Sequence, residues 1–431
     1  MIATTPIHAR ASIPLPRYFS VLREIAGEGR GGGRSRRDLH SLIPYNIRVE
    51  LIYLDNNSTT RPAPEVVAAM NQALDEWYGN PSSIHRFGQR ARQILDEARA
   101  RTAALLGCSD SELSFSGGGT ESINTAIRGI LAARAPRKKI VTTTVEHSAT
   151  RSCCKELSRQ GIQIVEIEVD MEGHLDLDAW ANALDDQTAL ASAMWANNET
   201  GVIFPIEKMA AMCREKQIPF HCDATQAVGK IPVNAKNAGI DAMTCAAHKF
   251  HGPKGVGALF IRRGLRFVPL VVGGPQEHNR RGGTENVPGI AGMGIAAELA
   301  LQHLPDMKRV AELRDRLETG ITHTIEDTHI NGDASNRVPN TTNIGFERLE
   351  AEAILLLLSE RGLCASAGAA CSSGSLEPSH VMKAMHLPDT IAHGAIRFSL
   401  SRYTTEAEID EALRILPGVI ERLRKVLPVG T

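Results

Sequence analysis

The chain has 431 residues, of which 42% are hydrophobic and 23% are charged, and 48 lysine and arginine residues nearly balance 49 aspartate and glutamate residues. A formal net charge of -1 gives no overall field that would attract nucleic acid or anionic lipid. The longest apolar run, at 353–358, is too short to cross a membrane. These properties argue against polyanion-binding and membrane-embedded classes and predict a globular, enzyme-sized chain of two or three domains.

Residues 1–50 differ in composition from the rest of the chain. They include the stretch GEGRGGGRSRR, which has neither helical nor strand periodicity, and they lack the apolar segment of a secretory signal. Such a composition cannot bury a hydrophobic face. We interpret this segment as a disordered extension or as sequence upstream of the true start codon, and an arginine-rich transit peptide is the less favoured alternative.

From Tyr53 onward, helical periods alternate with short β-rich runs, which predicts an α/β fold with parallel strands and helices on both faces of a sheet. Two amphipathic helices come first. The first is expected at 65–77, with its buried stripe at Val66, Met70, Leu74 and Trp77. The second is expected to bury Ala91, Ile94, Leu95, Ala98, Leu105 and Leu106.

Six runs have the composition of strands, at 139–144, 163–169, 189–195, 219–223, 242–247 and 257–262. Polar residues follow or end four of them: Glu146-His147, Asn197-Asn198, Asp223 and His248-Lys249. In open parallel sheets ligands bind beyond the carboxyl ends of the strands. We therefore expect these side chains to converge on one pocket.

A second domain is expected after the break at Leu304-Pro305-Asp306, where a long charged helix runs through Leu317. Strand-like and helical segments follow and end in a helix at 409–427. The sequence thus predicts a large domain over 51–305, whose first residues are free to pack on the other domain, and a smaller domain over 306–431.

Lys249 lies in the stretch CAAHKFHGPKG, directly after an apolar strand. Burial there would depress the pKa of its ammonium group, and a neutral amine forms a Schiff base with a carbonyl. An isolated His-Lys pair is more often a surface turn. The neighbouring motifs favour the reactive interpretation, because they supply candidates for the other parts of a pyridoxal phosphate site.

Two of these candidates are a carboxylate and a glycine turn. Asp223 is placed to pair with the pyridinium nitrogen, although DATQ also fits a helix capping box. The stretch FSGGGTES at 115–122 opens a helix with Gly118, Gly119 and Thr120, so that backbone N–H groups can approach a phosphate. It matches neither a nucleotide P-loop nor a dinucleotide fingerprint.

The eight cysteines form no Cys-x-x-Cys pair, and they indicate reduced thiols in the cytosol. Cys371 lies in a run of small residues from Cys364 to Ser379, which cannot pack a core and is expected to form a mobile loop. The other thiols that we interpret as buried and inert are Cys108, Cys154, Cys213, Cys222, Cys245 and Cys364. The spacing of cysteines and histidines suits no zinc site.

Nine stretches in this order resemble the cysteine desulfurases: YLDNNSTT, FSGGGTES, VEHSAT, WANNETG, HCDATQAVGK, AHKFHGPKGVGAL, RRGGTENV, SSGSLEPSHVM and AHGAIRFSLSRYTTEAEID. The resemblance covers about residues 52–425 and is strongest to the nitrogenase-associated NifS branch, followed by the housekeeping IscS-like branch. It implies a class V, fold-type I pyridoxal-phosphate enzyme that forms a homodimer. The implied architecture is a large domain with a mainly parallel seven-stranded sheet flanked by helices, plus a smaller α+β C-terminal domain.

The resemblance also implies a role for each matching residue. Lys249 would bind the cofactor as a Schiff base, His147 would stack on its ring and assist proton transfer, and Asp223 would pair with the pyridinium nitrogen. Gln226 and Asn198 would lie near the phenolic oxygen, and Asn198 and Arg397 near the substrate carboxylate, with Arg402 close enough in sequence to be confused with Arg397. The phosphate ligands would be Gly119, Thr120, His248 and Thr284 from the other subunit.

The implied reaction converts L-cysteine to L-alanine and leaves the sulfur as a persulfide on Cys371. A scaffold protein for iron–sulfur clusters would accept it, and the choice between nitrogenase-dedicated and housekeeping supply stays open. The resemblance implies no resident metal and allows a transient contact between Cys371 and cluster iron. The alternatives are a lyase for selenocysteine or cysteine sulfinate, which would not need the Cys371 thiol, and a noncatalytic binding protein of the sulfur pathway.

Five positions depart from the pattern of the relatives. Ala246 stands where they often have a phosphate-contacting serine, and Ala247 where glycine is usual. We therefore expect one phosphate hydrogen bond to be missing. Ala367 and Ala369 replace serines and Ser372 replaces a threonine, which changes the loop around Cys371 and leaves that thiol in place.

Overall fold

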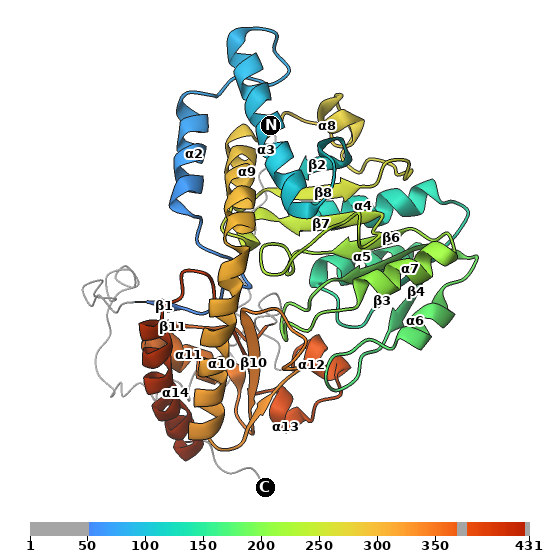
Figure 1. The fold of residues 1–431 in the computed structure, drawn as a ribbon. Helices are drawn as coiled ribbons and strands as arrows, with labels where there is room; N and C mark the ends of the chain where they lie inside the picture. The colour runs from blue at the N-terminus through green and yellow to red at the C-terminus, as the bar shows by residue number, and fades with distance from the viewer. Residues whose placement is uncertain (1–50, 369–376, 427–431) are drawn as a thin grey trace, which may run out of the picture. The chain divides into compact units, whose positions relative to one another are not determined.

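The computed structural model describes residues 51–368 and 377–426, and all of them belong to one compact unit (Figure 1). Its centre is a seven-stranded sheet in the order β2-β8-β7-β6-β5-β3-β4. The strands are β2 (Leu113–Ser116), β3 (Lys139–Thr143), β4 (Gln163–Ile167), β5 (Thr188–Met194), β6 (Phe220–Asp223), β7 (Ala242–Ala246) and β8 (Gly257–Ile261). Only β8 within this sheet runs antiparallel to its neighbours. The mainly parallel sheet and the six predicted strands are confirmed to within two residues.

Helices cover both faces of this sheet, and alternate residues of each strand face different helices. Ile140, Leu190 and Leu259 pack in one cluster with helices α4 and α5. The residues that follow them in sequence, Val141, Ala191 and Phe260, belong to the larger cluster on the other face. The helices of this part are α2 (Pro64–Asp75), α3 (Arg86–Leu106), α4 (Gly119–Ala133), α5 (Ser148–Arg159), α6 (Leu177–Ala183), α7 (Ile206–Glu215), α8 (Gln276–Asn279) and α9 (Val287–Gln302).

The predicted buried stripe of α2 is wrong at one position. Val66 is fully buried, but Leu74 is 62% exposed, and its neighbour Ala73 is buried in its place. A helical stripe advances by three or four residues, and the packed face of α2 takes the step of three from Met70 to Ala73. The six residues predicted to be buried on α3 are all buried.

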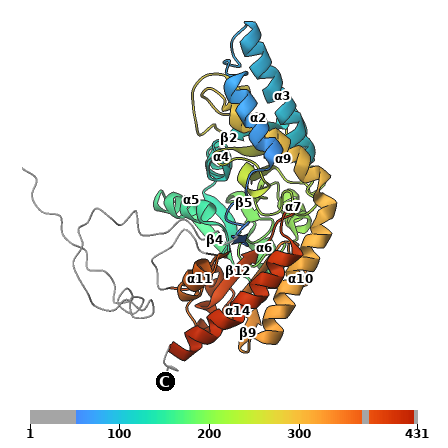
Figure 2. The same ribbon diagram turned by 90° about the vertical axis from the view of Figure 1, so that its left-hand side faces the viewer.

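A second hydrophobic cluster lies in the C-terminal part of the chain and includes Ile52 and Leu54. It surrounds a three-stranded sheet in the order β12-β10-β9 and a two-stranded parallel pair, β1 with β11. Figure 2 shows β9 and β12 in the lower half of the picture, below the large sheet. The strands are β1 (Ile52–Tyr53), β9 (Thr328–Ile330), β10 (Thr341–Phe346), β11 (Leu363–Cys364) and β12 (Ala395–Ser399). The helices are α10 (Met307–Thr324), α11 (Ala351–Glu360), α12 (His380–Ala384), α13 (Asp389–Ala392) and α14 (Glu406–Val426). The division into domains at residue 305 stays a prediction.

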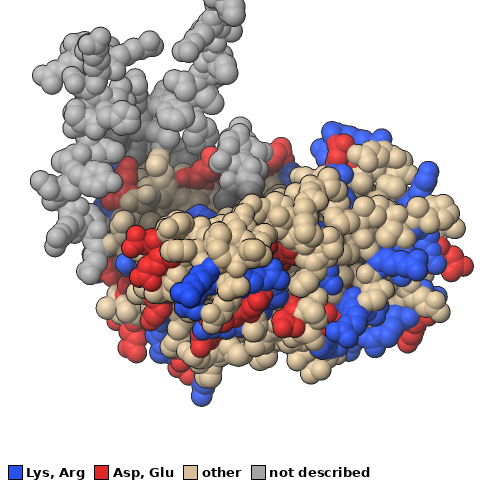
Figure 3. Space-filling model, turned by 90° about the horizontal axis from the view of Figure 1, so that it is seen from above, with Lys and Arg blue, Asp and Glu red and all other residues tan. Residues whose placement is uncertain are grey.

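The described surface carries both signs of charge. On the face seen in Figure 3, basic and acidic side chains are interspersed, in keeping with the near-neutral net charge. Within residues 51–368 and 377–426, no helix combines the length and the apolarity that crossing a bilayer requires.

The packing of Leu54 generates a stability prediction. This side chain is fully buried in the C-terminal cluster, whereas Leu51 is 68% exposed. Leu54→Ala is expected to lower the free energy of unfolding by about 2–5 kcal/mol, because it leaves a cavity. Leu51→Ala should stay within about 0.5 kcal/mol of wild type in the same urea titration. Equal losses of unfolding free energy in the two variants would contradict the burial of Leu54 and the exposure of Leu51.

Candidate active site

The predicted convergence of strand ends is confirmed for His147, Asn198, Asp223, His248 and Lys249, which line one cavity of about 160 Å³. The cavity opens at the carboxyl ends of β3, β5, β6 and β7 and at the start of α4. Its lining residues are Gly119, Thr120, Ile123, His147, Met194, Ala196, Asn198, Asp223, Thr225, Gln226, Ala246, His248 and Lys249. Eight of the residues singled out by sequence therefore lie together.

The glycine turn after β2 leaves the N-terminus of α4 open toward this cavity. Gly118 has a φ of 143°, which side-chain-bearing residues rarely adopt, and it caps α4 without a side-chain hydrogen bond. Gly119 begins the helix, so the N–H groups of its first turn have no partner in the preceding turn. An anion is stabilised at such an end by these N–H groups and by the helix dipole.

Lys249 ends a short 3-10 turn that follows β7. Its Nζ donates hydrogen bonds to the carbonyl oxygens of Asn57, at 2.6 Å, and Ser58, at 2.8 Å. The same carbonyl of Asn57 accepts from Nε2 of Gln226 at 3.0 Å. The segment around Asn57 therefore fixes the amine against one wall of the cavity, beside Gln226.

Asp223 and His147 both line the cavity, and each accepts a hydrogen bond from a backbone N–H group. Asp223 is 4% exposed, and its Oδ1 accepts from the backbone N–H of Thr225 at 3.0 Å. His147 caps α5, and its Nδ1 accepts from the N–H of Ala149 at 3.2 Å. Burial lowers the pKa of His147, which favours the neutral ring with its proton on Nε2. The region after Asp223 forms turns, so the alternative helix-capping role does not apply there.

Buried groups around His147 are also driven toward their neutral forms. Burial raises the pKa of Glu146 to about 8, although its Oε1 accepts from Thr143 Oγ1 at 2.8 Å and from Met194 N at 2.9 Å. Burial lowers the pKa of His248 to about 4. Both groups therefore favour their uncharged forms at neutral pH.

Arg397 does not line the cavity; it lies one layer behind Asn198. Its guanidinium donates to the carbonyl of Asn198 at 2.9 Å, to Asp55 Oδ1 at 2.7 Å and to Ser58 Oγ at 2.7 Å. Within the described chain, Nε of Arg397 and Oδ1 of Asn198 are buried without a hydrogen-bond partner. These two groups leave hydrogen-bonding capacity for a carboxylate and an amine or hydroxyl, respectively.

Besides Arg397, Thr284 is not brought to this cavity. Thr284 is exposed and lines a separate pocket with Gly117 and Arg281. Cys371 lies outside the described residues, as do Ala369 and Ser372. The residues that flank this gap approach the site: Ser366 exchanges backbone hydrogen bonds with Arg397, and Ser379 Oγ donates to Glu199 Oε2 at 2.5 Å.

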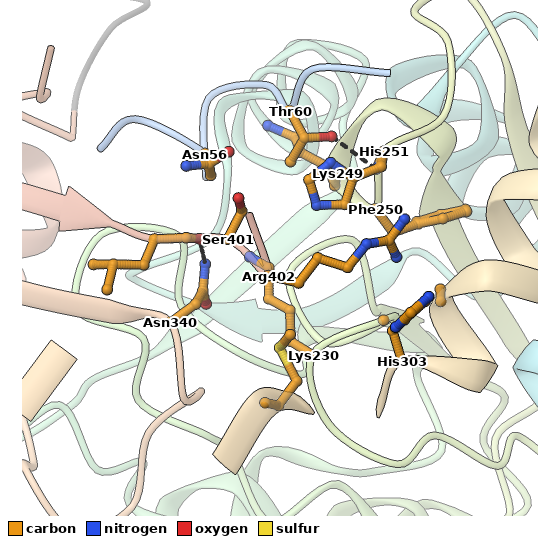
Figure 4. A pocket seen from close by; sticks show the side chains of 14 residues that line it. Asn56, Thr60, Lys230, Lys249, Phe250, His251, His303, Asn340, Ser401 and Arg402 are labelled. Atoms are coloured by element: carbon orange, nitrogen blue, oxygen red, sulfur yellow. Dashed lines mark hydrogen bonds between the residues drawn. The ribbon is translucent and has the colours of Figure 1, made fainter. Parts of the chain in front are cut away.

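A second cavity lies on the other side of Lys249 and is rich in basic residues (Figure 4). Lys230, His251, His303 and Arg402 line it, and Figure 4 shows the N–H of His251 bonded to Thr60. Arg402 therefore lines the second cavity, whereas Arg397 contacts Asn198 behind the first cavity. Nζ of Lys230 bonds to Oδ1 of Asn57 at 2.7 Å and to Oε1 of Gln226, and burial lowers its pKa well below the usual value.

The described cysteines are held as thiols. Five are buried, namely Cys153, Cys154, Cys213, Cys222 and Cys245. Cys108 and Cys364 are only partly buried, so the prediction of a buried thiol is wrong for these two. Their pKa values are raised all the same, to about 12 for Cys108, because both positions are partly removed from water. Thiolate chemistry is therefore disfavoured at the seven cysteines within 51–368 and 377–426.

Residue-by-residue interpretation missed Asn57, Ser58 and Asp55, which hold Lys249 and Arg397. Their stretch, YLDNNSTT, was noted only for its resemblance. The sequence did contain one signal of a functional loop here: small polar residues cluster between a strand and a helix that begins with proline. Asn57 and Lys249 are 192 positions apart, so the sequence does not reveal that they are in contact.

Comparison with known proteins places the chain among well-characterised relatives. The family model Aminotransferase class-V matches residues 52–412. The chain is 54% identical over 380 residues to cysteine desulfurase 2 of Trichormus variabilis, covering 88% of this chain and 96% of that protein. It is 52% identical over 379 residues to the cysteine desulfurase NifS of Azotobacter vinelandii, covering 88% and 94%. Among solved structures, a NifS-like protein superposes with a TM-score of 0.81 at 37% identity, covering 87% of this chain and all of that one.

The raised pKa of Glu146 predicts a pH-dependent stability. Between its ordinary value of 4.5 and its folded value of about 8, the carboxyl group loses its proton in the unfolded chain and keeps it in the folded one. This group therefore lowers the stability of the wild type as pH rises through that window. Glu146→Gln cannot titrate, so its free energy of unfolding relative to wild type should rise across the window in urea titrations. A difference that is constant with pH would contradict the buried, protonated state.

Proposed function

The chain belongs to the class-V aminotransferase family, among the cysteine desulfurases, and we propose that it removes the sulfur of L-cysteine as L-alanine forms, with pyridoxal phosphate as its cofactor. One observation carries this conclusion above the others: a single cavity gathers Lys249, His147 and Asp223 with the open end of α4. Each of these has a defined use in pyridoxal phosphate chemistry.

The residues of the cavity fit this cofactor. The α4 N-terminus suits its phosphate, the carboxylate of Asp223 suits the pyridinium nitrogen, and the amine of Lys249 suits its aldehyde. The buried Oδ1 of Asn198, which has no partner in the described chain, suits a hydroxyl donor beside the ring. When bound, the cofactor supplies an aldehyde for the substrate amine and a ring that accepts electrons.

The protein's own groups would bind the substrate and move its protons. Arg397 would hold the substrate carboxylate, with Asp55 and the Asn198 carbonyl keeping its guanidinium plane in position. Lys249 would take the proton from the α-carbon and return a proton as alanine forms. The neutral ring of His147 has Nε2 available to donate or accept a proton near the substrate.

The sulfur would pass to Cys371 by attack of its thiolate on the substrate sulfur. A sulfur–sulfur bond forms as the carbon–sulfur bond breaks, and the electron pair of the broken bond ends in a new C–H bond of alanine. L-cysteine and one enzyme thiol thus give L-alanine and one persulfide, with no external oxidant. Support comes from the seven described thiols, whose pKa values are all raised, and from the flanks of the loop, which are bonded beside Arg397 and Glu199.

The wider setting is part of the same proposal. A homodimer would bring Thr284 of the second subunit to the phosphate, which accounts for its exposure and its distance from the cavity in one chain. A cytosolic iron–sulfur scaffold protein would accept the persulfide sulfur. The similarity to the NifS of Azotobacter vinelandii favours supply to nitrogenase clusters.

The reaction is tested with purified protein and two substitutions. Wild type should show the visible absorption band of lysine-bound cofactor, which changes on addition of L-cysteine, and should release alanine and sulfide in the presence of a reductant. Lys249→Ala should lose both the band and the activity. Cys371→Ala should keep the band and lose sulfide release, whereas Cys364→Ala, the loss of a partly buried thiol, should retain it. Undiminished turnover by Cys371→Ala would favour the lyase alternative.

The role of Arg397 predicts a change in substrate affinity. Arg397→Lys loses the paired N–H groups that suit a carboxylate, so the KM for L-cysteine should rise about 10- to 100-fold. The kcat should change much less, because the lost contact is made before and during the reaction alike. Arg402→Lys, in the second cavity, is the matched control and should leave the KM within about twofold of wild type. A larger rise in KM for Arg402→Lys than for Arg397→Lys would instead indicate that Arg402 binds the substrate carboxylate.

A further inference from the structure

Thr225 carries an unexplained hydroxyl at the wall of the cavity. Its Oγ1 is buried and has no hydrogen-bond partner anywhere in residues 51–368 and 377–426. A buried hydroxyl without a partner costs about 1–3 kcal/mol, so such groups are rare in folded proteins unless a ligand completes them. Thr225 also lines the cavity, where a ligand can reach it.

The position of this hydroxyl points to the phosphate end of the cavity. A Cβ placed on Gly119 would lie 3.6 Å from Oγ1 of Thr225 and 3.4 Å from Cβ of Ala246. The hydroxyl of Thr225 and the methyl group of Ala246 therefore flank the first residue of α4, whose N-terminus is the anion site described above. The hydroxyl occupies a place from which it can donate to an anion held by that helix.

The backbone of Thr225 is already fixed with respect to the other end of the cofactor site. Its N–H donates to Oδ1 of Asp223 at 3.0 Å. A threonine has few χ1 rotamers because its side chain is branched at Cβ. The Asp223 contact therefore fixes the backbone of Thr225, the branched side chain leaves its hydroxyl few directions, and one residue connects the pyridinium partner to the phosphate site.

The other hydrogen-bond donors at the phosphate end of the cavity carry little positive charge. Of the described residues that line the cavity, only Lys249 and two histidines are basic, and Lys249 is assigned to the aldehyde. Burial lowers the pKa of His248 to about 4, so it offers a neutral N–H. The N–H groups of α4 and nearby hydroxyls are therefore needed to hold a phosphate, and a hydrogen bond to such a charged group is stronger than one between neutral groups.

We propose that Thr225 is a ligand of the cofactor phosphate and that its hydroxyl supplies the hydrogen bond that Ala246 lacks. This inference rests on the proposed pyridoxal phosphate site. It assigns the phosphate four contacts from this chain: the α4 N-terminus, Thr120, His248 and Thr225. The absence of a hydroxyl at Ala246 is thereby compensated from the adjacent strand end, after β6.

The test compares two probes, pyridoxal phosphate and pyridoxal without phosphate, in equilibrium titrations of cofactor-free protein followed by absorbance. Thr225→Val removes the hydroxyl and keeps the shape. It should weaken the binding of pyridoxal phosphate about 10- to 100-fold and leave pyridoxal binding unchanged. Thr225→Ser keeps the hydroxyl and should bind both probes as wild type does.

Two further variants separate a phosphate contact from a packing effect. Thr142→Val removes another buried hydroxyl that has no partner in the described chain, away from the cavity, and should bind both probes normally. Ala246→Ser, added to Thr225→Val, should recover most of the lost affinity for pyridoxal phosphate. This double variant places a hydroxyl at residue 246, whose Cβ lies 3.4 Å from a Cβ built on Gly119.

Three results would overturn the inference: unchanged pyridoxal phosphate binding in Thr225→Val, an equal loss for both probes, or no recovery in the double variant. The first would show that the hydroxyl does not contact the phosphate, and the other two that its loss acts through packing. A wild-type protein that binds neither probe would instead refute the proposed cofactor, and this outcome is distinguishable from the other three.

Discussion

Parallel pairing of β3, β5, β6 and β7 sets the carboxyl ends of these strands at one edge of the central sheet. The register places Met194, Asp223 and Thr244 side by side on three adjacent strands. A slip of one residue would turn Asp223 to the opposite face and replace it in the cavity with a neighbour. The apolar residues that alternate between the two helical layers prevent that slip, so the hydrophobic core determines where the chemistry is placed.

Burial at this edge has a second effect, because it suppresses charge on most of the titratable groups around the cavity. It raises the pKa of Glu146 and lowers those of His147 and His248, and it also lowers the pKa of Lys230, which lines the second cavity. The cavity therefore offers mainly neutral donors and acceptors around the carboxylate of Asp223. The open end of α4 and this carboxylate are the groups of the cavity that suit a phosphate and a protonated ring nitrogen, respectively.

Most of the large sheet was predictable from sequence, because continuous apolar runs followed by polar residues identify buried parallel strands and their functional ends. The same logic located Lys249, His147 and Asp223 in one cavity. Sequence patterns failed to predict burial where it depends on how a helix is rotated against its neighbours. Leu74 is exposed because another side of α2 packs against the core. Sequence patterns also failed where contacts join distant segments, as for Asp55 with Arg397, and no local pattern marks the hydroxyl of Thr225 as unpaired.

The segment 52–58 contacts residues near the other end of the described chain as well as residues of the central cavity. β1 pairs with β11, the N–H of Asn56 bonds to Ser399, and Asp55 pairs with Arg397. This segment also positions the amine of Lys249. During synthesis on the ribosome, the first strand must therefore wait, without its partners, until nearly all of the chain has emerged. Arg397 and Ser399, which contact the same segment as Lys249, are synthesised late, so the complete set of contacts around Lys249 forms only after most of the chain has been made.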